Sequence, residues 1–191
     1  VDVGTTALKV GAFDPAGNLL AFAGQRYAVD QPRADWVEQD ARQWLSALDA
    51  ALAEVLTKVD GQRVAAICPV GQSPTVVPSG ADGQPLRPAL TWADARAAAQ
   101  ADRLSEATGE YVNVEFAVLP RALWVKDEEP LNYQATRWFF QAADIVSFHL
   151  TGEPVTFSPG PELAPWTADT ISAAGLDPAK FPNRAVDPGT V

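Results

Sequence analysis

The hydrophobic pattern at the start of the chain limits the folds that it can adopt. In the segment ALKVGAF, the apolar Leu8, Val10 and Ala12 alternate with Lys9 and Gly11. Alternation with a period of two is typical of a strand that is buried on one face only. The pattern therefore indicates a sheet whose other face must be covered by a different element.

A helix is expected to follow this sheet. DPAGN at residues 14–18 is a turn and LLAFAGQRYAV returns from it, so residues 1–29 are predicted to form up to three adjacent antiparallel strands. Asp40, followed by Gln43 three residues later, resembles a capping box, and helical spacing then predicts a helix over 41–58. The apolar positions at helical spacing include Trp44, Leu48, Ala51, Leu52, Val55 and Leu56.

The remaining segments continue to alternate between strand and helix patterns. The further expected elements are a buried strand over 64–70, two short strands around the turn at 80–84, a helix over 95–107, a helix with Pro120 in its first turn, a short helix over 132–137, a strand and helix ending near Gly152, and a short helix near 167–175. This order predicts an α/β domain with a mixed sheet, with one domain as the default and two small ones as the alternative.

Composition excludes several function classes. The chain has 14 Lys and Arg against 24 Asp and Glu, a net charge of −10, and no basic stripe, so nucleic acid is not an expected partner. No apolar window has the length of a membrane span and no leader precedes the first strand, so we expect neither membrane insertion nor secretion, and a cytoplasmic location. The absence of methionine suggests that the natural start lies upstream.

Single copies of cysteine and histidine limit the metal and redox chemistry. Cys68 is the only cysteine and lies in an apolar run, so we expect a buried thiol and no disulfide within the chain. His149 is the only histidine, which excludes a site built on several histidines.

The opening stretch VDVGTT suggests chemistry as well as structure. Asp2 lies at a strand end and is followed by Gly4, Thr5 and Thr6, so backbone N–H groups and hydroxyls can converge on one place. Such a turn suits phosphate oxygens, and the carboxylate can hold Mg²⁺ through its waters. The alternative is an ordinary hairpin with polar side chains.

Four segments in order resemble the FGGY carbohydrate kinases. They are the opening hairpin, DWVEQDARQW at 35–44, GQSPTVVPSGADGQPLRPALTWADARA at 71–97, and LTGEPVT at 150–156. The resemblance covers essentially all of residues 1–191 and is greatest to xylulokinases. It implies a ribonuclease-H-like core, as in actin and Hsp70, and identifies the chain as the N-terminal part of a longer kinase, inactive when alone.

The resemblance implies phosphoryl transfer from ATP, with Mg²⁺, to a sugar or polyol hydroxyl. Asp2 would orient the Mg²⁺ shell through water, while Gly4, Thr5 and Thr6 would bind phosphate oxygens. Lys9 would offset negative charge, although a solvated lysine is an equal alternative because it lies opposite the apolar face of its strand.

Sugar contacts are expected in the 71–97 segment, at Gln72, Trp92, Asp94 and Arg96. A sugar needs an apolar wall for its C–H face and polar groups for its hydroxyls, which Trp beside Asp and Arg supplies. In the alternative interpretation, Trp92 is a half-buried strand residue and Asp94 is the N-cap of a helix that begins at Ala95.

The pair at 73–74 leaves the substrate open. Ser73 and Pro74 stand where glycerol kinases carry Arg-Glu and xylulokinases carry Met-His, and both of those pairs reach the substrate. The resemblance therefore does not specify the sugar.

The general base is not expected within this chain. In the family it is an aspartate further downstream, which places it beyond Val191 here, and the adenine pocket lies in a second domain. None of Asp144, Asp169, Asp177 and Asp187 has the motif that surrounds that base in the family, so no base is named in this chain.

Two other protein classes stay open at the sequence level. One is a sugar- or nucleotide-sensing module that does not catalyse, and the other is an Hsp70-like or actin-like ATPase, against which the 71–97 segment argues. A homodimer is one alternative for the oligomeric state.

Overall fold

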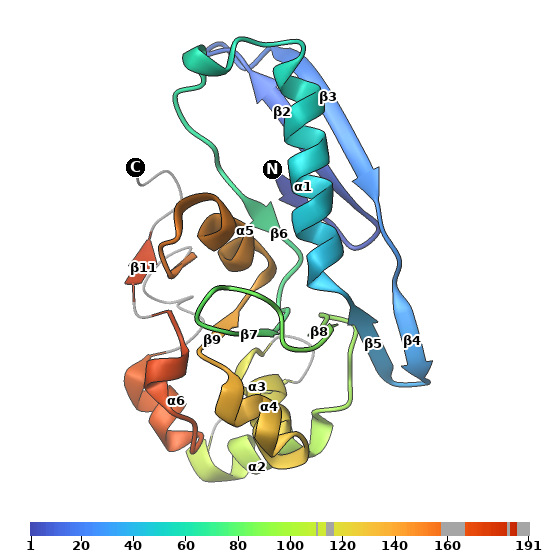
Figure 1. Cartoon of the computed structure of the whole chain (residues 1–191). Helices are drawn as coiled ribbons and strands as arrows, with labels where there is room; N and C mark the ends of the chain where they lie inside the picture. The colour runs from blue at the N-terminus through green and yellow to red at the C-terminus, as the bar shows by residue number, and fades with distance from the viewer. Residues whose placement is uncertain (110, 114–116, 158–166, 183, 187–191) are drawn as a thin grey trace.

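A mixed four-stranded sheet lies beside the N-terminus in the computed structural model, which describes residues 1–109, 111–113, 117–157, 167–182 and 184–186 (Figure 1). The strand order is β3-β2-β1-β6. β1 (Asp2–Val3) is antiparallel to β2 (Ala7–Phe13), which is antiparallel to β3 (Leu19–Arg26), and β1 is parallel to β6 (Val70–Gly71). The predicted meander over residues 1–29 is therefore confirmed.

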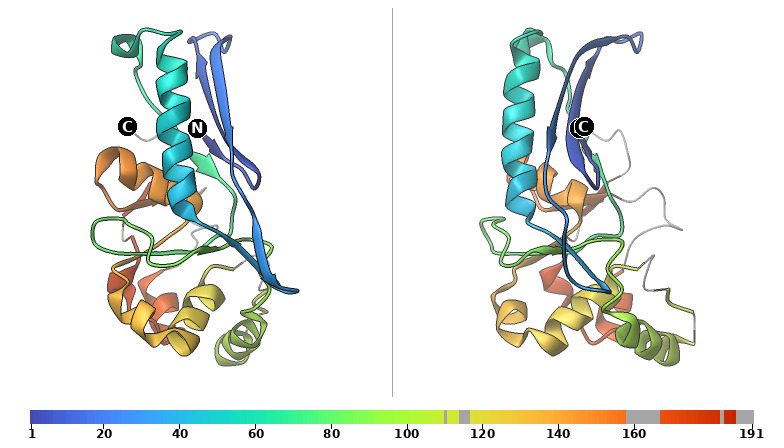
Figure 2. Two further views of the ribbon diagram at one scale, coloured as in Figure 1. Left: turned by 45° about the vertical axis from the view of Figure 1, so that its right-hand side comes forward. Right: turned by 90° about the vertical axis from the view of Figure 1, so that its right-hand side faces the viewer.

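Helix α1 (Ala41–Leu56) covers one face of this sheet (Figure 2). Asp40 is its N-cap, as predicted, and the Asp40 side chain accepts a hydrogen bond from Arg42 N. Gln43 does not complete a capping box, because its Oε1 instead accepts from Ala28 N at 3.3 Å.

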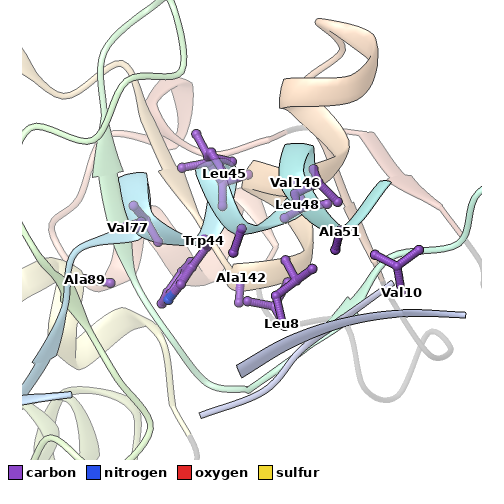
Figure 3. Close-up of a cluster of buried hydrophobic side chains, with 14 of the residues drawn as sticks. Leu8, Val10, Trp44, Leu45, Leu48, Ala51, Val77, Ala89, Ala142 and Val146 are labelled. Atoms are coloured by element: carbon purple, nitrogen blue, oxygen red, sulfur yellow. The ribbon is translucent and has the colours of Figure 1, made fainter. Parts of the chain in front are cut away.

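The core between α1 and the sheet follows the predicted periodicity (Figure 3). Trp44 and Leu48 are fully buried, Val55 is buried, and Leu52 packs against the cluster while partly exposed. Leu8 from β2 packs in the same cluster. The strand alternation thus matches the helical stripe, and this match gives the domain its first core.

A second hydrophobic core includes Val76, Leu90, Leu123 and Phe139. The remaining sheets of the molecule have the orders β4-β5-β8, β7-β9 and β10-β11. The elements not yet given are β4 (Asp30–Arg33), β5 (Trp36–Gln39), the short η1 (Gly61–Arg63), β7 (Val77–Ser79), β8 (Ala89–Leu90), α2 (Ala98–Thr108), α3 (Leu119–Glu128), α4 (Pro130–Ala135), β9 (Trp138–Phe140), α5 (Ala142–Thr151), β10 (Val155–Phe157), α6 (Ala168–Ala173), the short η3 (Pro178–Lys180) and β11 (Arg184–Val186).

Several predicted elements of the chain after β6 are confirmed. α3 has proline in its first turn, α5 ends at Gly152 with a left-handed C-cap, and α6 lies within 167–175. The turn at 80–84 requires glycine at Gly83, where φ is +78° and an added Cβ would lie 2.5 Å from the Phe148 ring.

The predicted buried strand over 64–70 is wrong for residues 64–69, which have no strand assignment; residues 64–68 are exposed. The observed strand β6 begins at Val70, whose N–H donates to Val1 O at 2.8 Å. Cys68 lies in the exposed run before it and is therefore not buried as predicted.

The helix predicted over 95–107 begins later, at Ala98. Asp94 is therefore not its N-cap; Ala97 is, without a side-chain hydrogen bond. The Asp94 carboxylate accepts from Arg96 N and holds a turn before the helix. Among the described residues, no helix has both the length and the apolar character needed to cross a membrane.

Candidate functional site

In the turn between β1 and β2, residues 4–6, every carbonyl oxygen accepts a hydrogen bond from the protein. Gly4 O accepts from the Tyr27 hydroxyl, Thr5 O accepts from Gln39 Nε2 at 2.6 Å, and Thr6 O accepts from Tyr27 N at 3.4 Å. Within the described chain, the N–H groups of Thr5 and Thr6 have no hydrogen-bond partner. The turn therefore presents two backbone donors that an anion can accept.

Glycine leaves room at the start of this turn. Gly4 N donates to Ala7 O at 3.1 Å, which closes the turn tightly. A Cβ at Gly4 would lie 3.1 Å from both Ala7 O and Lys9 Nζ. A larger residue would therefore crowd the Ala7 carbonyl and displace the Lys9 ammonium.

Tyr27 fixes the turn from the sheet side. Its hydroxyl and its backbone N–H both bond to the turn, and its ring packs against Trp44 at a centroid distance of 6.4 Å. Burial, with a smaller effect of the Asp2 carboxylate, raises the pKa of the Tyr27 phenol. The hydroxyl therefore stays protonated and remains a donor to Gly4 O.

Asp2 and Lys9 lie next to the turn and bind each other. Lys9 Nζ donates to Asp2 Oδ2 at 2.8 Å, and both side chains are 46% exposed. Half-exposed pairs contribute little to stability, typically below about 1 kcal/mol, so either group is free to change partner when a ligand arrives.

The donor set around Asp2 fits a Mg²⁺ ion held by one carboxylate. In the described part of the chain no group of three or more His, Cys, Asp or Glu could hold a metal by itself. Mg²⁺ commonly keeps several waters and takes one or two carboxylates plus substrate phosphates. One half-exposed carboxylate beside a turn of free N–H groups suits that mode of binding.

Trp92 joins the site from a distant part of the sequence. It follows β8 by two residues, its side chain is 45% exposed, and its Nε1 donates to Thr5 Oγ1 at 3.1 Å. An exposed indole face thus lies beside the β1–β2 turn. This is the geometry expected of an apolar wall for a small ligand bound next to the turn.

Gln72 reaches the same turn through another side chain. Gln72 N donates to Val3 O at 2.9 Å, and its Nε2 donates to Gln39 Oε1 at 2.6 Å. Because Gln39 also bonds to Thr5 O, Gln72 and Trp92 approach Thr5 from two directions.

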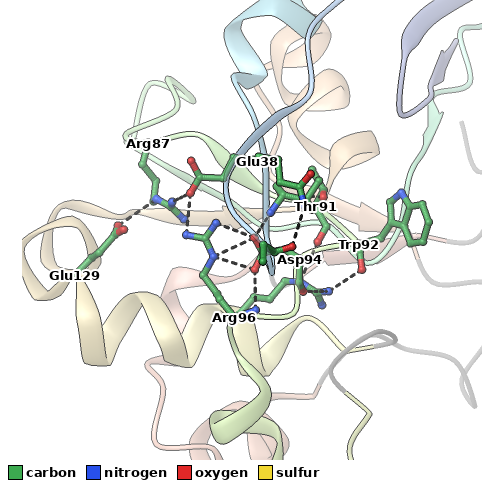
Figure 4. A network of polar contacts seen from close by, with 11 residues as sticks. Glu38, Arg87, Thr91, Trp92, Asp94, Arg96 and Glu129 are labelled. Atoms are coloured by element: carbon green, nitrogen blue, oxygen red, sulfur yellow. Dashed lines mark hydrogen bonds and ion pairs between the residues drawn. The ribbon is translucent and has the colours of Figure 1, made fainter.

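Asp94 and Arg96 are turned into the protein instead (Figure 4). Arg96 Nη2 lies 2.7 Å from Asp94 Oδ2 and Arg96 Nη1 lies 2.8 Å from Glu38 Oε1, with the two partners' side chains 0% and 13% exposed. The Arg96 guanidinium lies 3.8 Å from the centroid of the Trp36 ring. The structure therefore brings Asp2, the turn, Lys9, Gln72 and Trp92 together, but not these two side chains.

Two aspartates of the second half of the chain, Asp144 and Asp177, bond to nearby backbone N–H groups. Asp144 is buried at the start of α5, and its Oδ2 accepts from Gln141 N at 2.9 Å. Asp177 Oδ1 accepts from Ala179 N at 2.9 Å and caps η3.

The general base is expected beyond Val191, and this expectation stays a prediction. Val191 itself and Asp187 lie outside the described residues. The catalytic position of the site is therefore unassigned in this chain.

Sequence reasoning did not identify Gln39, Tyr27 or Arg121. Arg121 is fully buried and donates to the carbonyls of Thr91 and Trp92, at 3.1 and 3.0 Å. These bonds hold the backbone at Trp92 in place. A buried arginine in an apolar helix gives no local pattern. Gln39 lies in the WVEQD segment, and the resemblance of this segment to a family motif could have identified it as a candidate.

Comparison with known proteins places this chain in a family. Residues 1–158 match the model of the FGGY family of carbohydrate kinases, N-terminal domain. The xylulose kinase of Bacillus subtilis is 32% identical over 161 residues, covering 80% of this chain and 32% of the relative. The xylulose kinase of Streptomyces rubiginosus is 32% identical over 209 residues, covering 100% of this chain and 42% of the relative.

Solved structures agree with this assignment. The xylulose kinase from Rhodospirillum rubrum superposes with a TM-score of 0.84 at 27% identity, over 96% of this chain and 42% of that chain. The glycerol kinase from Plasmodium falciparum, at 16% identity and a TM-score of 0.77, shares the fold over 96% of this chain and 42% of its own length. The predicted α/β fold is confirmed as that of the sugar kinases.

The chain spans between 32% and 42% of the length of these relatives. The family match over most of the residues and the fold agree with the motifs that carried the resemblance. The chain belongs to the FGGY family of carbohydrate kinases.

Proposed function

We propose that the protein to which this chain belongs transfers the γ-phosphoryl group of ATP to a hydroxyl of a sugar or polyol, with a ketose such as xylulose as the first candidate. The observation that carries the proposal is the β1–β2 turn, with its three carbonyls bonded and the N–H groups of Thr5 and Thr6 free among the described residues. Phosphoryl transfer depends mainly on positioning and charge neutralisation, and this turn supplies donors at fixed positions.

The geometry of the turn supports the following roles on the phosphate side. Thr5 and Thr6 donate their N–H groups to phosphate oxygens, and Gly4 leaves room beside the Ala7 carbonyl and the Lys9 ammonium. Lys9 would exchange its bond to Asp2 for a phosphate oxygen, and the released Asp2 carboxylate would then hold Mg²⁺ through the waters of the ion. The ion, when bound, neutralises part of the charge on the phosphates.

On the sugar side, Trp92 is the proposed apolar wall and Gln72 the proposed hydrogen-bonding group. Asp94 and Arg96 remain predicted sugar contacts, but their side chains are 0% and 1% exposed. A direct bond from either one to a sugar requires the network with Glu38 to open. We assign no general base within this chain and expect an aspartate beyond Val191.

The experiment separates the two halves of the site. In the full-length protein, Asp2→Ala should lower kcat by orders of magnitude with little change in sugar affinity, because it acts mainly in the transition state. Trp92→Ala should instead raise the KM for the sugar and leave the affinity for ATP nearly intact. Asp30→Ala, an exposed carboxylate on β4, is the matched control for Asp2 and should leave both constants unchanged.

Two results would contradict these roles. A folded Asp2→Ala variant with near-normal kcat removes the phosphate role of the VDVGTT turn. A folded Trp92→Ala variant with an unchanged KM makes the 71–97 segment purely structural. Circular dichroism of each variant checks folding first.

A sugar- or nucleotide-binding module that does not catalyse is the second candidate. A coupled assay of the full-length protein with ATP and a panel of ketoses and polyols discriminates, since a module binds but produces no ADP. The 191-residue chain alone should stay well below a rate of roughly 1 s⁻¹. A faster rate would mean that the chemistry has been misplaced.

The cellular setting of the protein is also a proposal. We expect a cytoplasmic enzyme that works on small molecules, with neither nucleic acid nor a membrane as partner. A homodimer stays a hypothesis, which light scattering of the purified protein tests directly.

A further inference from the structure

Gln39 occupies a position from which one side chain reaches both halves of the site. It is the last residue of β5, directly before the N-cap of α1, and its side chain is fully buried. A buried primary amide carries two donor hydrogens and an acceptor oxygen that all require partners. The identity of those partners decides what Gln39 does.

Each bond of Gln39 goes to a different segment. Nε2 donates to Thr5 O at 2.6 Å and to Ala28 O at 3.3 Å, while Oε1 accepts from Gln72 Nε2 at 2.6 Å. The amide therefore connects the β1–β2 turn to the residue that follows β6. The two bonds of 2.6 Å need both an amide donor and an amide acceptor on one side chain. An apolar residue of the same shape can form neither bond.

Thr5 is held from a second side by Trp92, whose Nε1 donates to Thr5 Oγ1 at 3.1 Å. The two proposed sugar contacts, Gln72 and Trp92, are thus each connected to Thr5, one through Gln39 and one directly. A ligand that fixes either side chain also fixes Thr5, whose N–H is a proposed phosphate donor.

We propose that Gln39 is a positioning residue that couples occupancy of the sugar side to the geometry of the phosphate turn. The inference rests on the proposed function, because it needs both ligands to bind this chain. It adds that bound sugar further restricts the motion of the Thr5 and Thr6 N–H groups before the nucleotide arrives. By linkage, nucleotide then raises sugar affinity by the same factor.

The test measures that factor by calorimetry on the full-length protein. The probes are a non-hydrolysable ATP analogue with Mg²⁺ and D-xylulose, or the first sugar of a ketose and polyol panel that binds. In the wild type, saturating sugar should tighten nucleotide binding by about 5- to 150-fold, the usual range of coupling between sites. In Gln39→Met the factor should fall below about 2, while nucleotide affinity without sugar changes by less than about 3-fold.

Gln43→Met is the matched control, since Gln43 is an exposed glutamine four residues along that bonds to Ala28 but not to Thr5. It should keep the wild-type factor. A substitution that merely loosens the fold would lower the nucleotide affinity by the same factor with and without sugar. The coupling factor would then stay at its wild-type value, so this factor distinguishes positioning from general destabilisation.

Hydrogen exchange of the wild type keeps the inference testable if Gln39→Met does not fold. Sugar alone should slow exchange of the Thr5 and Thr6 amides, measured on the peptide that contains the turn. Unchanged exchange, a wild-type factor of about 1, or a folded Gln39→Met variant with the wild-type factor would each overturn the proposal. A wild type that binds neither probe instead overturns the proposed function itself.

Discussion

Removal of the Arg96 guanidinium should destabilise the chain strongly. In the folded protein this group lies 2.7 Å from Asp94 Oδ2 and 2.8 Å from Glu38 Oε1, and its own side chain is 1% exposed. Arg96→Met fills a similar volume but leaves the fully buried Asp94 carboxylate without its cation. Breaking a buried pair in this way typically costs about 3–5 kcal/mol, because the remaining charge stays desolvated.

The expected effect is measured as the free energy of unfolding in urea. Each kcal/mol lowers the melting temperature of a domain of this size by about 2–4 °C, so the variant should melt roughly 6–20 °C below the wild type. Arg42→Met is the matched control, because Arg42 pairs with Asp40 at 2.8 Å but its side chain is 64% exposed. The control should change stability by less than about 1 kcal/mol.

Arg96→Lys separates charge from shape. Lysine retains the positive charge but loses the planar fork that faces both carboxylates and the stacking on Trp36, so its stability should lie between wild type and Arg96→Met. If the free energy of unfolding of Arg96→Met lies within about 1 kcal/mol of the wild-type value, this cation does not stabilise the carboxylates and the reasoning is wrong.

Three further predictions concern stability. Burial raises the pKa of Asp144 to about 7 from 3.8, so the folded state holds a proton that the unfolded state releases, and stability is lost as the pH rises from 4 to 7. Urea unfolding should show Asp144→Asn gaining roughly 4 kcal/mol relative to wild type between about pH 4 and pH 8, and a pH-independent difference would contradict this. Gly83→Ala should cost more than Gly17→Ala, because both have positive φ but an added Cβ meets a ring only at Gly83; equal melting temperatures would refute the steric part. Leu48→Ala, fully buried, should cost about 2–5 kcal/mol in urea unfolding, whereas Leu56→Ala, 48% exposed on the same helix, should cost under about 1 kcal/mol.

The elements that could be predicted from the sequence are those whose partners are close in the chain. Strands β2 and β3 pair through a short turn, and α1 packs back on them directly, so the alternation in 7–13 and the helical stripe from Trp44 to Val55 determined this part. The residues at 64–69 failed because apolar composition alone does not make a strand. In the structure residues 64–68 are exposed, so this run lacks the burial that its composition predicted.

In the candidate site, too, the residues that are close in the sequence could be predicted together, whereas contacts between distant residues could not. Asp2 and the turn at 4–6 are contiguous, and their proximity was evident from VDVGTT. Trp92 could be expected near them only through the family resemblance, since 87 residues separate it from Thr5. The burial of Asp94 and Arg96 could not be foreseen, because it depends on Glu38 and Trp36 from another strand.

The exposed Cys68 gives the chain an experimental handle. It is the only cysteine, and it lines a shallow groove of about 280 Å³ together with Asp2, Lys9 and Val70. Within residues 1–191 a thiol-reactive fluorophore therefore attaches at a single place, in the same groove as the Asp2–Lys9 pair. Rearrangement of that pair changes the local field at the dye, so the labelled 191-residue chain reports ligand arrival at the β1–β2 turn optically without any substitution.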